Sequence, residues 1–131
     1  MRFLLACVTA FALGALTPPV IAAPDVLAGS WSGGGTVKPN NGASEAVRCR
    51  VKYTKDTGRT YLINATCSVP GVGRYQQTGR VVKVSNSRFT GRLYSEQYSV
   101  TGNVVISVSG SRQTISLSSS KGTGRLNLSK R

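Results

Sequence analysis

Hydrophobic and polar residues alternate along the chain from about residue 30 onward, and no segment has the spacing of an amphipathic helix. The clearest strand is 46–53, where apolar side chains share one face and basic side chains share the other. The apolar face carries Val47, Cys49, Val51 and Tyr53, and the basic face carries Arg48, Arg50 and Lys52. This pattern predicts a strand with one buried side and one solvated side.

Clusters of glycine, proline, asparagine and serine interrupt the alternation and divide the chain into strands. The predicted strands are 30–37, 46–53, 60–68, 74–84, 88–95, 98–108, 112–119 and 124–130. A turn is expected at 55–59, and the glycines at 33–35 predict a bend or a bulge. About eight short antiparallel strands favour an all-β up-and-down barrel over a sandwich, because closure leaves no exposed sheet edge.

The first 22 residues have the pattern of a secretory signal peptide. Arg2 precedes an apolar run at 4–16, and cleavage is expected after Ala22, with Val20 at the −3 position. Cys7 ends a lipobox-like sequence, but the three residues before that sequence leave no room for an apolar segment. We therefore expect an exported protein, periplasmic or extracellular, with one β-barrel domain at 23–131.

Two cysteines, Cys49 and Cys67, lie beyond the predicted signal peptide. An even cysteine count in an exported chain predicts a disulfide. A hairpin folded about Gly58 places Cys49 opposite Cys67 and Tyr53 opposite Ile63, with both cysteines on the apolar face. Strand phase and cysteine count therefore predict the same bond.

The net charge of the chain indicates which partners to expect and says nothing about the fold. Beyond residue 22 the chain has 16 lysines and arginines and four acidic residues, a net charge of about +12. Anionic polysaccharide, lipopolysaccharide or a membrane surface are the expected partners. The candidate binding residues are cations on predicted outward positions: Arg48, Arg50, Lys52, Arg80 and Arg92. Because the outward positions are polar, a transmembrane barrel is not expected.

The chain has no histidine, which removes the commonest general base and metal ligand. The acidic residues are scattered at Asp25, Glu45, Asp56 and Glu96. We expect no enzyme, no cofactor and no metal site. Arginines and tyrosines alternate on some strands, as in single-strand nucleic-acid binders. Nucleic acid is nevertheless not an expected partner, because an exported protein meets little of it.

The tripeptide Thr-Gly-Arg occurs four times, at 57–59, 78–80, 90–92 and 123–125. The intervals between copies differ, so the tripeptide is not a structural repeat. Gly79 and Gly91 fall inside predicted strands, where glycine indicates a bend or a bulge. We therefore expect each copy to serve a local turn or bend of the backbone, and we do not expect the four copies to form one binding motif.

Gly29-Ser30-Trp31 resembles the opening of lipocalin-like, avidin-like and bacterial metalloprotease-inhibitor barrels. The resemblance implies that Trp31 plugs the closed end of the barrel under a basic residue near the C-terminus, here Arg125 or Arg131. The inhibitor-type resemblance also uses the two later cysteines. It implies that segment 23–27 enters the cleft of a protease.

The mature chain also resembles a family of small exported alphaproteobacterial proteins without an established activity. The matching segments are 31–37, 47–51, Cys67 and 89–96. This resemblance implies an envelope or secreted β-domain with a Cys49–Cys67 bridge and no catalytic residues.

These patterns predict an exported, non-catalytic binding protein. Its basic outer face would engage anionic envelope material, or its interior would hold one small ligand. The alternative is a protease-inhibitor-like or host-facing module that binds a protein through segment 23–31.

Overall fold

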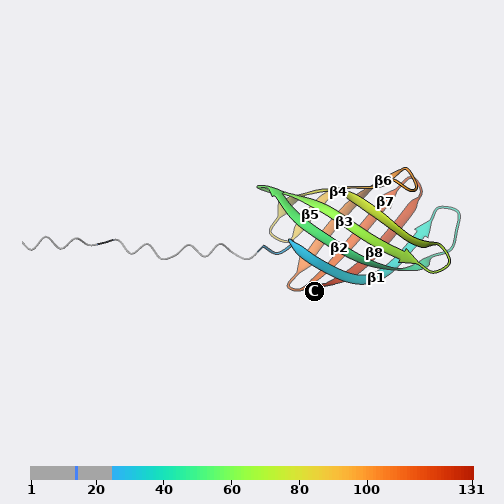
Figure 1. The fold of residues 1–131 in the computed structure, drawn as a ribbon, viewed down its shortest axis with the longest axis horizontal. Helices are drawn as coiled ribbons and strands as arrows, with labels where there is room; N and C mark the ends of the chain where they lie inside the picture. Colours follow the sequence, from blue (N-terminus) through green and yellow to red (C-terminus); the bar gives the residue numbers. More distant parts are fainter. Residues whose placement is uncertain (1–13, 15–24) are drawn as a thin grey trace, which may run out of the picture.

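The computed structural model describes residues 25–131, together with Gly14, and confirms the all-β barrel (Figure 1). The strands are β1 Gly29–Pro39, β2 Glu45–Thr57, β3 Thr60–Val69, β4 Gly73–Ser85, β5 Arg88–Ser95, β6 Val100–Ser109, β7 Arg112–Ser119 and β8 Gly122–Lys130. Each strand pairs antiparallel with the next, and β8 pairs with β1, so the sheet closes. The predicted signal peptide at 1–22 lies outside the described residues, apart from Gly14.

The two ends of the barrel carry different connections (Figure 1). One end has the β2–β3, β4–β5 and β6–β7 turns, the segment before β1 and the C-terminus; we call it the closed end. The other end has the β1–β2, β3–β4, β5–β6 and β7–β8 connections; we call it the mouth. Within the described part of the chain, no helix is long and apolar enough to cross a membrane.

The core fills the closed end of the barrel. Inward positions alternate with exposed ones along the strands, as a half-buried sheet requires. The largest side chains that are fully buried include Trp31, Tyr53, Phe89, Leu27, Ile106 and Leu128. All six lie near the closed end in their strands or just before β1. Among the described residues, only Ser95 and Gln113 are buried polar side chains.

The predicted disulfide is present. Cys49 and Cys67 are bonded and lie directly opposite each other on β2 and β3, while Tyr53 lies opposite Ile63. The register expected from the strand phase is therefore confirmed. A bridge closing a loop of 18 residues contributes on the order of 3 kcal/mol in the chain-entropy model.

The central Thr-Gly-Arg copies face each other on β4 and β5. A Cβ at Gly79 would overlap the carbonyl oxygen of Arg92, and a Cβ at Gly91 would overlap that of Arg80. Each glycine therefore makes room for the backbone of the opposite copy, which lets the two neighbouring strands approach closely at this point. Neither Gly79 nor Gly91 forms a bulge, because the strand registers are continuous through both.

The glycines at 33–35 also allow neighbouring strands to approach closely, but they form no bulge. β1 keeps a continuous register with both β2 and β8. A Cβ at Gly33 or Gly35 would overlap backbone oxygens of β8. The register shifts lie elsewhere, between Lys55 and Thr57 and between Lys83 and Ser85.

Several predicted boundaries were wrong. β1 continues to Pro39 rather than residue 37, and β8 begins at Gly122 rather than residue 124. The turn expected at 55–59 is limited to Gly58 and Arg59, because β2 continues to Thr57 through its register shift. The sixth strand was expected from residue 98 but begins at Val100. Tyr98 and Ser99 instead belong to the β5–β6 turn, in which Ser99 adopts a positive φ of 49°. Alternation in the sequence continues through both turns, so periodicity does not reveal where pairing stops.

Candidate functional site

A cavity opens at the mouth of the barrel, with a volume of about 510 Å³. Small-molecule sites occupy roughly 300–1,000 Å³. The walls are contributed by β1 and by β4 to β8. The main apolar lining residues are Val37, Tyr75, Leu93, Val100 and Leu117. The mouth is therefore a concave and mostly apolar site.

The cavity exists because inward residues near the mouth are small. Gly102 and Gly124 line it without a side chain, and Ser95 and Ser119 contribute only short ones. At the closed end the corresponding space holds large side chains such as Trp31 and Phe89. An eight-stranded barrel is just wide enough for its side chains to fill it, so small residues in one layer leave room for a ligand.

The hydroxyl of Ser95 is the polar group that distinguishes this cavity. Ser95 lies at the end of β5, lines the cavity and is 5% exposed. Its Oγ has no hydrogen-bond partner in the described structure. An unpaired buried hydroxyl costs about 1–3 kcal/mol, so a bound group that pairs with it after rotation of the side chain would be favoured. The half-buried Gln77 is a further polar residue of the lining.

Two tyrosines form the aromatic side of the mouth. The rings of Tyr75 and Tyr98 meet edge to face, with centroids 6.0 Å apart. The turn that carries Tyr98 is held against β4, because Gln76 N–H donates a 3.2 Å hydrogen bond to the side-chain oxygen of Gln97. Burial, and secondarily the nearby Tyr98 phenol, raises the pKa of Tyr75, which keeps its phenol neutral. The pair gives the mouth an aromatic edge made of two nearly perpendicular rings.

The predicted basic residues lie on the outside of the barrel. Arg48, Arg50 and Lys52 are exposed at successive outward positions of β2. Arg80 and Arg92 lie directly opposite each other on β4 and β5, and both are exposed. The structure thus groups these residues into one basic row and one facing pair. It brings none of them into the mouth cavity.

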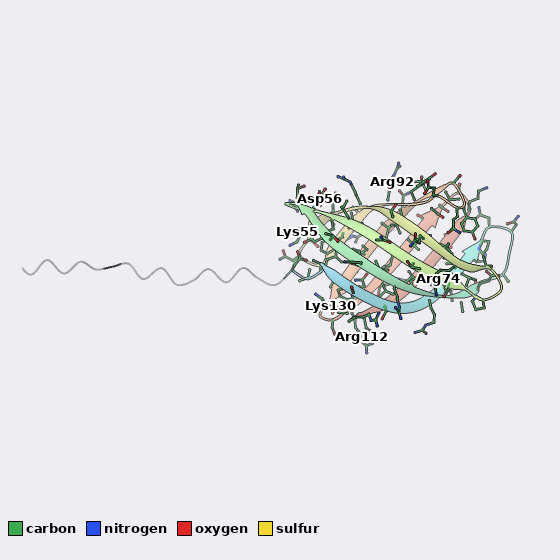
Figure 2. The ribbon with its side chains drawn as sticks, in the orientation of Figure 1. Lys55, Asp56, Arg74, Arg92, Arg112 and Lys130 are labelled. Atoms are coloured by element: carbon green, nitrogen blue, oxygen red, sulfur yellow. A yellow bond between two sulfur atoms is a disulfide. The ribbon has the colours of Figure 1, made fainter. Side chains whose placement is uncertain are left out.

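The facing arginines differ in their surroundings. Arg80 forms an ion pair with Asp56 at 3.2 Å, whereas no carboxylate within the described residues pairs with Arg92. Arg92 projects outward (Figure 2) and lines a shallow groove of about 420 Å³ with Thr101, Asn103 and the serines 118–120. Like charges directly opposite on a sheet repel, and the Asp56 partner offsets this for Arg80 alone.

Trp31 closes the other end of the barrel, as the resemblance implied. It is fully buried, and its Nε1 donates a 2.9 Å hydrogen bond to the carbonyl of Leu27. The cation over its ring is Lys130, with Nζ 5.5 Å from the centroid, so the expectation of Arg125 or Arg131 was wrong. Lys130 lies opposite Trp31 in the β1–β8 pairing, whereas Arg125 points outward opposite Thr36.

The segment before β1 is bound to the barrel rather than extended from it. Asp25 accepts hydrogen bonds from Leu27 N–H, Ala28 N–H and the Tyr61 hydroxyl at 2.9, 2.8 and 2.7 Å. Leu27 and Trp31 are fully buried, and within 25–31 the exposed hydrophobic side chain is Val26. The described part of segment 23–31 therefore offers little apolar surface to a protein target.

The acidic residues and cysteines form no metal-binding cluster within residues 25–131, where no group of three or more such side chains gathers. Cys49 and Cys67 are joined to each other.

Sequence reasoning did not identify the residues of the mouth cavity. Ser95 and Gln77 are polar residues at inward positions of their strands. This combination could have indicated a cavity. Gly102 and Gly124 interrupt otherwise apolar inward positions at the mouth-side starts of β6 and β8. The alternation alone does not tell whether such positions face a cavity or each other.

No family model matches the chain, and no curated protein matches its sequence. Solved structures share the fold. A redesigned β-barrel, mFAP1, bound to DFHBI, is 15% identical with a TM-score of 0.66, over 81% of this chain and 95% of that chain. EF1p2_mFAP2b bound to DFHBI is 11% identical with a TM-score of 0.68, over 81% and 94%. Rv2717c from M. tuberculosis is 12% identical with a TM-score of 0.61, over 83% and 98%. The chain therefore has the fold of small barrels, two of which were solved with a ligand bound.

Proposed function

We propose that this protein is an exported, non-catalytic binding protein that holds one small ligand in its mouth cavity. The observation that carries the proposal is the mostly apolar mouth cavity of about 510 Å³, which has the buried Ser95 in its lining. A mostly apolar pocket with a few placed polar groups is the usual form of a ligand site. The barrels of the same fold that bind DFHBI support this use of the architecture.

Export and the absence of catalysis rest on the sequence and on the disulfide. The signal-peptide pattern of residues 1–22 and the Cys49–Cys67 bond both suit an oxidising compartment. The chain has no histidine to act as a general base. The cavity lining contains no aspartate, glutamate or cysteine, so it lacks the usual acid, base and thiol nucleophile.

The cavity is tested by filling it. Leu117 lines the cavity, while its neighbour Ser116 is exposed on the outer face of β7. N-phenyl-1-naphthylamine, a neutral aromatic probe, should bind the wild-type protein and increase its fluorescence. Leu117→Trp should weaken binding at least roughly tenfold by occupying the space, whereas Ser116→Trp should leave it within about twofold.

A urea titration would establish that both variants fold. Probe binding that is absent, or equal in Leu117→Trp and wild type, would rule out the cavity as the site.

The outer basic row supports a second candidate function, binding of anionic envelope material. Arg48, Arg50 and Lys52 are exposed, and neither ion pair of the described residues involves them. Such a row attracts polyanions and is screened by salt. Retention on a heparin column should end at lower salt for the triple variant Arg48→Gln, Arg50→Gln, Lys52→Gln.

The control for this experiment removes the same charge elsewhere, in a triple variant with Arg88→Gln, Arg112→Gln and Arg131→Gln, all of which are exposed. Equal elution of the two triple variants, or retention of the wild type at about 1 M salt where the Debye length is about 3 Å, would exclude the basic row as the binding surface.

A further inference from the structure

Two lysines stand at one edge of the mouth cavity. Lys38 near the end of β1 and Lys121 in the β7–β8 turn both contribute to its lining. The two segments are joined, because Asn40 donates from its backbone N–H to the Lys121 carbonyl at 3.0 Å and from its side chain to the Ser120 carbonyl at 2.5 Å. Lys38 and Lys121 thus belong to one connected part of the rim, and both side chains are exposed.

No carboxylate neutralises these lysines within the described residues. The ion pairs there join Lys55 to Asp25 and Arg80 to Asp56. Glu45 and Glu96 lie toward the same end of the barrel, at the start of β2 and in the β5–β6 turn, but neither lines the cavity. The cavity therefore has positive charge at its rim and no negative charge in its walls.

Below the rim the walls become apolar. Val37, Leu93, Val100 and Leu117 surround the interior, and the unpartnered Ser95 hydroxyl is the buried polar exception. A molecule seated here would place apolar atoms against these walls and its polar end near the lysines. A cationic group at the rim would be repelled, while a carboxylate, sulfonate or phosphate would be attracted by the two lysines.

We infer that the ligand is an anionic amphiphile, with an apolar body inside the barrel and an acidic group between Lys38 and Lys121. This inference rests on the proposed function, since it names the ligand class of the same cavity. Partly exposed ion pairs contribute modestly, so the two lysines together should change affinity by roughly three- to tenfold. The lysines select the sign of the ligand's charge, and the apolar walls supply most of the affinity.

A pair of probes with the same aromatic skeleton tests the inference. 1-Anilinonaphthalene-8-sulfonate carries a sulfonate, and N-phenyl-1-naphthylamine lacks it. In the disulfide-bonded protein, the double variant Lys38→Gln, Lys121→Gln should weaken binding of the sulfonate probe by roughly three- to tenfold. It should change binding of the neutral probe by less than about twofold.

The matched control is the double variant Arg88→Gln, Arg112→Gln, which removes two exposed charges that lie at the closed end and outside the cavity lining. It should leave both probes nearly unaffected. Sulfonate binding that falls equally in the two double variants, or that survives Lys38→Gln, Lys121→Gln, would overturn the anionic inference and leave the cavity in place. Binding of neither probe to the wild type, or binding of both that is insensitive to Leu117→Trp, would overturn the proposed function and the inference with it.

Discussion

The phenol of Tyr53 on β2 donates a 2.6 Å hydrogen bond to the side-chain oxygen of Gln113 on β7, across the interior of the barrel. β2 and β7 are not neighbours in the sheet, because β1 and β8 lie between them. Both side chains are buried, at 1% and 3% exposure. Burial raises the pKa of Tyr53, although the bond to Gln113 opposes the shift, so the phenol stays neutral and remains a donor.

This bond predicts strong coupling between the two positions. Tyr53→Phe leaves Gln113 buried without its partner and should cost about 1–3 kcal/mol. Gln113→Leu should cost a similar amount, because it leaves the Tyr53 hydroxyl unpaired. The double variant Tyr53→Phe, Gln113→Leu should be less destabilised than the sum of the two. Urea unfolding of the four proteins measures the coupling, with the exposed Tyr94→Phe as control; additive losses would show that the bond contributes nothing.

Protonation of Asp25 should make the free energy of unfolding depend on pH. Burial raises its pKa, but hydrogen bonds from Ala28, Tyr61 and Leu27 and the charge of Lys55 outweigh this, so the pKa falls below its ordinary value of 3.8. A lowered pKa stabilises the folded state above the unfolded pKa, and the contribution is lost as the pH falls through the folded pKa. The difference in unfolding free energy between wild type and Asp25→Asn should be about 1–2 kcal/mol at pH 7 and should shrink below about pH 4.

Tyr61→Phe is the companion variant for this titration. Tyr61 donates to Asp25, and burial together with that carboxylate raises the pKa of Tyr61 to about 12. Its removal should move the acid transition toward higher pH, since one bond that stabilises the carboxylate is gone. A difference between wild type and Asp25→Asn that does not change with pH would contradict the assignment.

The disulfide should account for a large part of the stability. Cys49→Ala with Cys67→Ala should lower the free energy of unfolding by about 3 kcal/mol, chiefly because the unfolded chain regains the entropy of the 18-residue loop. Urea titrations with and without a thiol reductant measure this. The reductant should shift the wild-type midpoint and leave the double variant unchanged; an unchanged wild-type midpoint, with reduction verified by thiol titration, would argue against a stabilising bond.

Gly91 should tolerate no side chain. Its added Cβ would meet the backbone of Arg80, which cannot move without separating β4 from β5. Gly91→Ala should therefore cost more than about 3 kcal/mol or prevent folding. Gly42→Ala is the control, because its Cβ would meet the Pro39 ring only at 3.5 Å. Thermal unfolding compares the two variants. Equal midpoints would mean that β4 and β5 leave room for a side chain at Gly91.

Replacing Ser95 with alanine should raise the stability of the protein and weaken ligand binding. Ser95→Ala removes a buried hydroxyl without a partner and should stabilise the unliganded protein by up to about 1 kcal/mol. The same change should weaken a ligand that pairs with the hydroxyl. Combined urea and ligand titrations separate the two effects. A destabilised Ser95→Ala protein would indicate that the hydroxyl already has a partner when no ligand is bound.

Much of the architecture follows from the sequence because strand geometry is local. A strand has a side-chain period of two, so the alternation at 46–53 determined that Cys49 faces inward and Arg50 outward. A short hairpin then determined that Cys49 and Cys67 lie opposite each other. The outward position of Arg48, Arg50 and Lys52 followed from the same period.

The site was decided by tertiary structure, because it depends on side chains from strands far apart in the sequence. Whether the mouth is filled depends on the combined volume of the inward residues from β1 and from β4 to β8. The registers of all the strands decide which of these residues lie at the same level along the barrel axis. The cation over Trp31 was likewise chosen by the β1–β8 register, which brings Lys130 to the ring and turns Arg125 outward. The sequence by itself determined which side chains point inward, and closure of the barrel decided which of them meet and where a space remains.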